Sequence, residues 1–233
     1  YRARQGAKMS VARLTALEHF LFEGAAEGAD PHPLFNLRFY VGQSDELAQT
    51  GENPLIHYLR TGWREGLEPH PLFAGAWYLE QNPEAQAAGS ASRRDEGTKG
   101  AAEGLDPHPL FDTAYYRGQR HGVLRGGALS DFLASGARAL KSPTPHFNPA
   151  YYLEQAGDRP QAHANPLTHY LSLGTHEGLW PAPDFDEAGY FTAHPEAATS
   201  PRSGLEHWTR RKAERPAPGG GGGRAVSAGS LFK

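Results

Sequence analysis

The chain contains no cysteine, so disulfide bonds and thiolate metal sites are excluded and its stability has to come from packing. No apolar run approaches the roughly 20 residues that a membrane-spanning helix requires, which predicts that the chain does not insert into a membrane. Hydrophobic residues make up 38% of the sequence, which is low for a globular core. We therefore expect the apolar residues to be concentrated at particular positions.

Charge of one sign and the common site motifs are also lacking. The formal net charge is −3 and no basic face stands out, so the sequence gives no reason to expect a nucleic-acid partner. A phosphate-binding loop, a dinucleotide fingerprint, a Gly-x-Ser-x-Gly nucleophile and a calcium loop are all missing from it. We expect no catalytic residue, no cofactor and no metal ion. The chain starts at Tyr1 without a signal-peptide pattern, and we interpret it as a fragment or a processed product.

What the sequence does have is an internal repeat of 38 residues. The fullest copy reads His-Tyr-Leu-Arg-Thr-Gly-Trp-Arg-Glu-Gly at 57–66, then Pro-His-Pro-Leu-Phe at 69–73 and Trp-Tyr-Leu at 77–79. Glycines 24, 62, 100, 136 and 174 mark the same frame, with one step of 36. The residues that define the repeat are His19, His57, His169, His207, Gly62 and Gly174. A fixed period of this length is typical of repeat architectures, in which each unit packs on its neighbours.

Each copy begins with the pattern of a short helix. Asn53 offers a capping side chain, and Pro54 occupies the first helical position, where its missing N–H is not needed. Leu55, Tyr58 and Leu59 follow at i, i+3 and i+4 and predict one buried stripe. Gly62 stands where a left-handed residue often ends a helix. Residues 165–174 repeat this pattern.

A Pro-His-Pro segment follows and cannot be helical, because proline restricts both itself and the residue before it. It predicts an extended connector that places Leu72 and Phe73 in the core. Asp112, Asn148 and Asp186 then stand before aromatic pairs and are expected to cap a second helix. The sequence thus predicts an all-α fold of about six 38-residue helix-pair units in a short solenoid. Its predicted parts are a lead-in (1–13), the repeat array (14–218) and a Gly-rich flexible tail (219–233).

The twelve histidines suggest a metal site, but the frame argues for a structural role. Residues one repeat apart lie roughly 8–10 Å from each other in packed helices, too far to share one ion. A pair of His57 and His70 within one copy stays geometrically conceivable. We expect instead that these imidazoles donate to backbone carbonyls of the turns. His57 is also predicted to point away from the apolar stripe, toward the adjacent repeat or the connector.

The aromatic residues suggest stacking platforms for sugar rings, although their fixed places in the frame favour a role in the core. Trp63 and Trp180 are the exceptions, because other copies carry different residues at their positions. Residues that vary within a repeat frame are the better candidates for a ligand or partner face. The acidic residues before the second glycine, such as Glu65, are expected to cap or to pair with arginines of the Arg64 type.

Residues 53–66 together with Pro69, Phe73, Tyr78-Leu79 and Asn82-Pro83-Glu84 resemble a bacterial helical repeat. Its general form is N-P-L-x-H-Y-L-x-x-G-x-x-E-G-R-x-P-x-P-x-F-D-x-x-Y-Y-L-x-x-N-P-D-V, and the likeness covers about residues 14–218. Such repeats occur beside glycosyltransferase and polysaccharide-synthesis domains and in surface proteins. The resemblance implies a noncatalytic module of such a system, in the cytoplasm or at the surface of a bacterium.

The expected function is therefore a scaffold or interaction module that binds a protein partner or a glycan along one face. Two alternatives stay open at the level of sequence. The chain can be the accessory region of a glycosyltransferase whose catalytic domain lies outside it. It can also be a structural subunit of a larger assembly.

Overall fold

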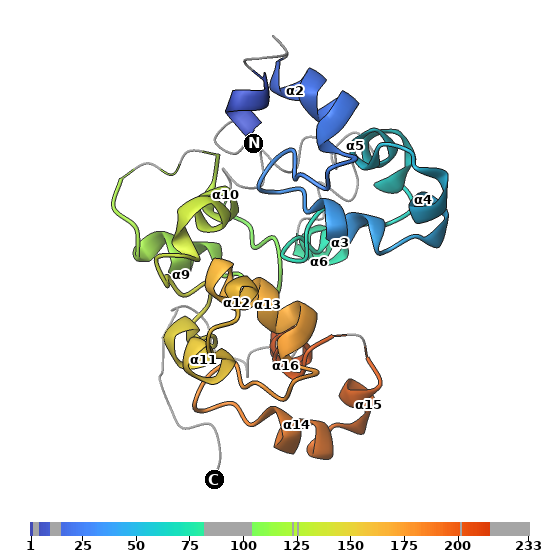
Figure 1. Ribbon diagram of the computed structural model, residues 1–233. Helices are drawn as coiled ribbons and strands as arrows, with labels where there is room; N and C mark the ends of the chain where they lie inside the picture. Colours follow the sequence, from blue (N-terminus) through green and yellow to red (C-terminus); the bar gives the residue numbers. More distant parts are fainter. Residues whose placement is uncertain are drawn as a thin grey trace. The chain divides into compact units, whose positions relative to one another are not determined.

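The computed structural model describes residues 1, 5–9, 15–81, 104–122, 124, 126–200 and 202–214. Over these residues it contains short helices and irregular connectors and no β-strand, which confirms the predicted all-α class for this part of the chain (Figure 1). In the same residues, no helix is both long and apolar enough to cross a membrane. The first helix of the third copy and the proposed tail at 219–233 lie outside the described residues, as does most of the lead-in.

The chain divides into two compact units, Tyr1–His108 with Arg120–Gly136 and Pro109–Gln119 with Ala137–Lys233. The first unit contains α2 (Ala16–His19), η1 (Phe20–Gly24), α3 (Leu37–Val41), α4 (Asp45–Thr50), α5 (Pro54–His57), η2 (Tyr58–Gly62), α6 (Gly75–Gln81), α10 (Ala128–Asp131) and η3 (Phe132–Gly136). The second unit contains α9 (Thr113–Gly118), α11 (Pro149–Ala156), α12 (Pro160–Ala164), α13 (Pro166–His169), η4 (Tyr170–Gly174), α14 (Glu187–Ala193), α15 (Pro195–Ala198) and α16 (Gly204–Glu214).

The first helix of a copy begins as predicted and then widens. The Asn53 side chain accepts from the N–H groups of Leu55 and Ile56 at 3.1 and 3.4 Å, with Pro54 at the first helical position. Four residues later α5 continues directly into the π-helical η2, and the Trp63 N–H donates to the Tyr58 carbonyl five residues back. The same change from α to π follows α2, α10 and α13. The widening is therefore a property of the repeat.

Two predictions for this helix are wrong because of the π-helical turn. Gly62 was expected to be left-handed, but it lies inside η2 with a helical backbone, and the left-handed residue is Gly66 with φ 80°. Leu59 was expected in the buried stripe, but 46% of it is exposed. A π-helical turn holds more residues than an α-helical one, so the i, i+4 spacing no longer keeps Leu59 on the buried face.

The second helix of a copy is capped as predicted, and a third helix was not predicted. Asp112, Asn148 and Asp186 each accept from the N–H three residues on, at 2.8–3.0 Å. A further short helix follows the aromatic helix in three copies, as α4, α12 and α15. The prediction of helix pairs is thus wrong in this respect. Pro160 and Pro195 at first helical positions are the local signals for the extra helices.

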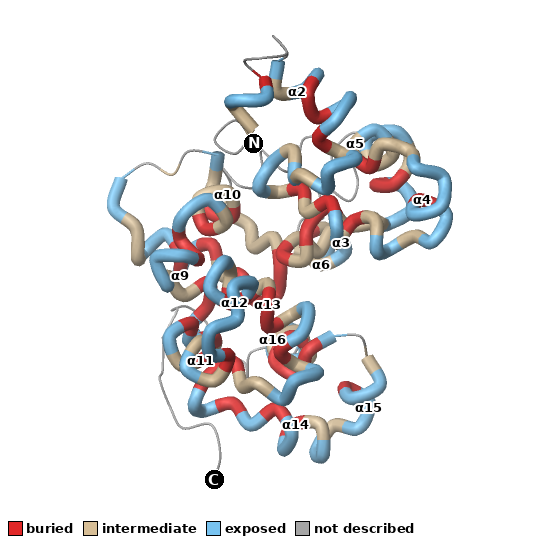
Figure 2. The backbone as a smooth tube through the Cα atoms, in the orientation of Figure 1, coloured by how far each residue is buried: buried red, intermediate tan, exposed pale blue. Residues whose placement is uncertain are grey.

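The core of a copy forms where its aromatic helix meets the first helix of the next copy. In the first unit, Phe35, Tyr40 and Leu47 form a buried cluster on which Leu55 and Tyr58 pack. In the second, Phe147, Tyr152 and Tyr170 make the equivalent ring contacts. Along α14 the buried Glu187 and Tyr190 alternate with exposed residues, seen as red and pale blue in Figure 2. Of the two predicted connector residues, Leu72 is fully buried and Phe73 is half-buried.

Candidate functional site

In the four copies that have the frame histidine, it binds a tyrosine that lies 17 or 18 residues before it in the chain. Tyr40 Oη lies 2.8 Å from His57 Nδ1, and Tyr152 and Tyr190 make the same bond to His169 and His207 at 2.6 and 2.7 Å. Tyr1 bonds His19 at 2.5 Å, so the predicted lead-in carries one element of the repeat. The expectation that His57 meets an adjacent copy is confirmed. The expectation that His57 bonds a backbone carbonyl of the turn is wrong.

Burial favours the neutral form of the tyrosine in this pair, and at His169 it also favours the neutral imidazole. Burial raises the pKa of the Tyr40 and Tyr152 hydroxyls above the usual value of 10.0, and burial lowers the pKa of His169. His57 Nε2 faces the Glu65 carboxylate at 3.7 Å, which favours the tautomer with its proton on Nε2. His57 Nδ1 therefore accepts a hydrogen bond that the Tyr40 hydroxyl donates.

The glycine that marks the frame makes room for this tyrosine. A Cβ atom on Gly62 would lie 1.8 Å from Tyr40 Oη, and one on Gly174 would lie 2.1 Å from Tyr152 Oη. Since neither backbone is left-handed, the glycines are required by close approach and not by their φ angle. Tyrosine, histidine and glycine thus form one contact between successive copies.

A glutamine that sequence reasoning missed joins four of the aromatic helices to the next connector. Gln43 Nε2 donates to the Glu68 carbonyl at 2.8 Å, and Gln43 Oε1 accepts from the Glu68 N–H at 2.9 Å. Gln119 and Gln155 make the same paired bonds to the backbone of Ser142 and Trp180. The signal was present, because Gln43, Gln81, Gln119 and Gln155 recur at steps of 38, 38 and 36.

The connectors of successive copies are also joined directly through their backbones. The Asn36 N–H donates to the Pro69 carbonyl at 2.8 Å, and the Asn148 N–H donates to the Pro181 carbonyl at 2.9 Å. Ala74 and Asp112 make equivalent bonds to the first proline of the connector that follows each of them. Proline has no backbone N–H, and its carbonyl oxygen is the acceptor that this contact requires.

The histidine within the Pro-His-Pro connector accepts a hydrogen bond from a backbone N–H, whereas we expected it to donate one to a backbone carbonyl. His70 Nδ1 accepts from the Leu72 N–H at 3.0 Å, and His32 makes the same contact to the Leu34 N–H at 3.2 Å. Burial lowers the pKa of His70 to about 4, so its imidazole is neutral at physiological pH. This contact closes a tight turn within the connector.

Among the described residues, no group of three or more histidine and acidic side chains is placed to hold a metal ion. His57 and His70, the conceivable pair, use their Nδ1 atoms for Tyr40 and for the Leu72 N–H. Glu27, Glu65 and Glu177, the acidic residues at this frame position that the structure describes, do not pair with Arg64. Glu65 faces His57, while Glu177 pairs with Arg159 at 3.5 Å.

A buried carboxylate in the second unit gave no signal in the sequence. Glu187 is 5% exposed, and burial raises its pKa. Its Oε2 accepts from the Tyr170 hydroxyl at 2.8 Å, and its Oε1 accepts from the Gly204 N–H at 2.7 Å. The Tyr170 hydroxyl and the Gly204 N–H both bond this carboxylate within the fold. Glu187 therefore holds α16 to its neighbours and has a structural role.

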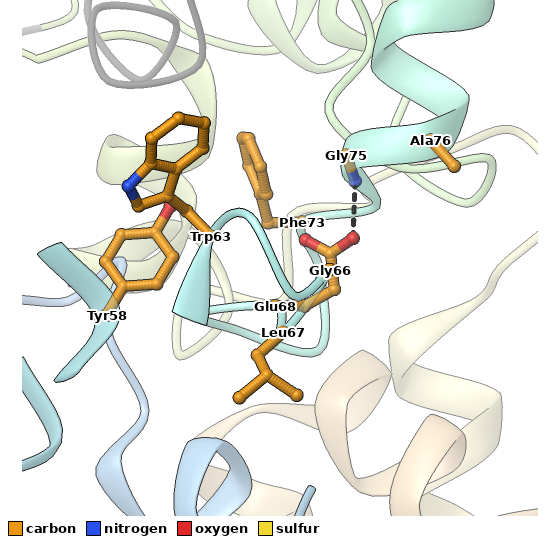
Figure 3. Close-up of a pocket in the computed structure, with 8 residues that line it drawn as sticks. All are labelled: Tyr58, Trp63, Gly66, Leu67, Glu68, Phe73, Gly75 and Ala76. Atoms are coloured by element: carbon orange, nitrogen blue, oxygen red, sulfur yellow. Dashed lines mark hydrogen bonds between the residues drawn. The ribbon is translucent and has the colours of Figure 1, made fainter. Parts of the chain in front are cut away.

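The candidate tryptophan of the second copy lines a small pocket. Tyr58, Trp63 and Phe73 present their rings to it, and Glu68 lies below them with its carboxylate accepting from the Gly75 N–H at 2.8 Å (Figure 3). The pocket has a volume of about 150 Å³. Trp63 is only 8% exposed, and the Arg64 guanidinium lies over its ring at 4.4 Å.

Trp180 has a different environment. Its backbone N–H and carbonyl are held by Gln155 at 3.0 and 2.9 Å, and its side chain is half-buried. The two candidate tryptophans therefore do not make equivalent surfaces.

Several large apolar side chains of the first helices are exposed. Leu21 and Leu59 occupy the same position of the frame and are 37% and 46% exposed. Leu133 and Leu171 occupy that position in two further copies and are half-buried. A leucine thus recurs at a site where none of these four copies buries it fully.

The chain matches no family model, no curated protein sequence and no solved structure.

Proposed function

We propose that this chain is a noncatalytic helical repeat array, stacked as a short solenoid, that binds a protein partner or a glycan along one face. As the sequence resemblance implies, its setting is a bacterial cell-surface or polysaccharide-synthesis system. The observation that carries the proposal is the recurrent leucine at 21, 59, 133 and 171, which is exposed in the first two copies and half-buried in the other two.

The polar groups of the frame support a noncatalytic role. The tyrosines, histidines and glutamines that recur every 38 or 36 residues bond to an adjacent copy. Catalysis needs a group that is free to meet a substrate, and these side chains are committed to stacking. The contacts join consecutive copies within each compact unit, which favours a linear array.

The recurrent leucine supports a binding face. An apolar side chain on a repeat can be buried against the next copy, yet the π-helical turn directs this one toward solvent. Exposed apolar residues that gather on one face mark interaction sites. A concave or convex face lined by one residue per copy is how repeat proteins present an extended surface.

The experiment is a glycan array with the wild-type chain, with Leu21→Ser/Leu59→Ser and with the exposed-site control Ala134→Ser. Binding by the wild type and the control that is lost in a folded leucine variant supports a glycan face at these residues. Undiminished binding by the leucine variant overturns the assignment of the face. Turnover of a bound glycan overturns the noncatalytic assignment.

A second candidate is a structural subunit of a larger assembly, and the exposure of Phe22 and Leu17 at 74% and 58% favours it. Sedimentation velocity tests it with the same leucine variant. Self-association of the wild type that the Leu21→Ser/Leu59→Ser variant lacks supports the assembly. A chain that stays monomeric at all concentrations overturns the assembly, and the leucine face then binds a different partner.

A further inference from the structure

The pocket beside Trp63 combines three aromatic rings with one carboxylate. Tyr58, Trp63 and Phe73 line its wall, and Glu68 brings a negative charge to its floor (Figure 3). Leu67 and Ala76 complete an otherwise apolar lining. Aromatic faces carry negative charge density, and several of them around one space attract a cation whose surface is apolar.

The size of the pocket selects among cations. Its volume is about 150 Å³, and a cavity of about that volume in another protein holds a molecule of the size of benzene. A tetramethylammonium group has five heavy atoms and fits this space, whereas a peptide segment does not. A quaternary ammonium also gives up little hydration when it enters an aromatic site, unlike a primary ammonium.

The combination of tryptophan and glutamate at these two positions occurs in the second copy only. The position of Trp63 holds Ala25, Ala101, Ala137 and Thr175 in the other copies, and the position of Glu68 holds Asp30, Asp106, Ser142 and Trp180. Trp63 and Glu68 are thus additions of the second copy to the repeat frame.

The Trp63 ring already attracts a cation in this structure. The guanidinium carbon of Arg64 lies 4.4 Å from the ring centre, although Arg64 is an exposed residue with water available to it. Cation–π contacts at exposed sites contribute about 0.5–1 kcal/mol, and more where the cation is desolvated. In the pocket a cation would meet three aromatic side chains together, those of Tyr58, Trp63 and Phe73.

We propose that the pocket formed by Tyr58, Trp63, Phe73 and Glu68 binds a quaternary ammonium group, as in choline or trimethyllysine. The rings surround the methyl groups, and the Glu68 carboxylate supplies the opposite charge. None of the recurrent leucines lines the pocket, so it is a binding function in addition to the proposed face.

The test is isothermal titration of the full chain with choline, with its neutral isostere 3,3-dimethyl-1-butanol, and with glycine betaine. Choline is expected to bind at least about tenfold more tightly than the neutral alcohol, because only choline gains the cation–π contacts. Betaine is expected to bind more weakly than choline, since its carboxylate meets Glu68. A trimethyllysine peptide titrated in parallel separates a protein-borne group from a free small molecule.

Matched variants place the binding in the pocket. Trp63→Leu and Phe73→Leu keep apolar volume and remove a ring, and each is expected to weaken choline binding about tenfold. Glu68→Gln keeps an acceptor for the Gly75 N–H and removes the charge, so it weakens choline binding without unfolding the connector. Trp180→Leu is the control and leaves the affinity unchanged.

Equal affinity for choline and the neutral alcohol overturns the proposal, as does choline binding that survives Trp63→Leu and Phe73→Leu. Binding of methyl glucoside in place of choline, lost in Trp63→Leu, also overturns it and makes the pocket a sugar site. Each of these results leaves the leucine face untested and intact, because that face is probed by other variants.

Discussion

The second and fifth copies share the sequence Asn-Pro-Leu-x-His-Tyr-Leu and are held in nearly the same way. Tyr40 Oη lies 2.8 Å from His57 Nδ1, and Tyr152 Oη lies 2.6 Å from His169 Nδ1. Gln43 and Gln155 each make two hydrogen bonds to the connector backbone. They differ at other positions of the same segment. Trp63, Glu68 and His70 of the second copy are replaced by Thr175, Trp180 and Ala182 in the fifth.

The difference separates two kinds of residue. A side chain that bonds across copies is constrained by a partner on the neighbour, so changing it leaves a buried polar group without its bond. Positions 63, 68 and 70 are not kept between the two copies. The pocket of the second copy combines Trp63 and Glu68, which differ between them, with Tyr58, which the fifth copy keeps as Tyr170.

The largest expected effect comes from filling the glycine site in both copies. Gly62→Ala and Gly174→Ala should each cost about 3 kcal/mol of unfolding free energy, because the new methyl group displaces a buried tyrosine and breaks its bond to histidine. Urea unfolding measures this. Adding Tyr40→Phe to Gly62→Ala should cost less than the sum of the two single changes, and strict additivity would contradict the close-approach argument.

A pH dependence should distinguish the second copy from the fifth. Folding lowers the pKa of His70 from 6.5 to about 4, so the neutral form is favoured in the native state. The resulting stability is fully present above pH 6.5 and is lost as the pH falls toward 4, by about 3 kcal/mol. His70→Asn keeps an acceptor for the Leu72 N–H without titrating. Urea unfolding from pH 7 to 4 should show a shallower decline for this variant, and equal slopes would contradict the assignment.

The glutamine contact should contribute equally to the free energy of unfolding in both copies. Gln43→Ala and Gln155→Ala each remove two hydrogen bonds to a backbone and should cost about 2 kcal/mol. The bond from Gln81 to the Asp106 carbonyl of its connector is longer, at 3.4 Å, so Gln81→Ala should cost less than either. Thermal unfolding of the three variants ranks them, and a larger effect at Gln81 would contradict the paired-bond geometry.

The smallest effect concerns the left-handed position that Gly66 and Gly178 occupy. The fourth copy has Leu140 there, with φ 52° and 43% of the residue exposed. A left-handed backbone costs a residue other than glycine roughly 1–2 kcal/mol, so Leu140→Gly should stabilise the chain by about 1 kcal/mol. Gly178→Ala is the reciprocal change and should destabilise it by about as much. A Leu140→Gly chain that melts earlier than the wild type would show that Leu140 packs usefully.

Much of the fold was open to prediction because its signals are local. The caps at Asn53, Asp112 and Asn148, the proline at the first helical position and the non-helical connector all depend on residues within three positions of each other. The third helix of a copy was missed although Pro160 and Pro195 signalled it. Of the candidate site, the sequence distinguished Trp63 by its variation within the frame, and the rings and carboxylate around it could not be placed.

The sequence by itself determined the all-α class of the described residues, the repeat frame and the start of the first and second helices of a copy, since these follow from short-range sterics and capping. The tertiary structure alone decided which group each histidine binds, because Tyr40 and His57 are 17 residues apart and meet only when copies pack. It also decided that Gly62 is needed for the approach of Tyr40 and that Leu59 faces solvent. Contacts between copies depend on how the helices lie against each other, and a linear pattern of residues does not contain that geometry.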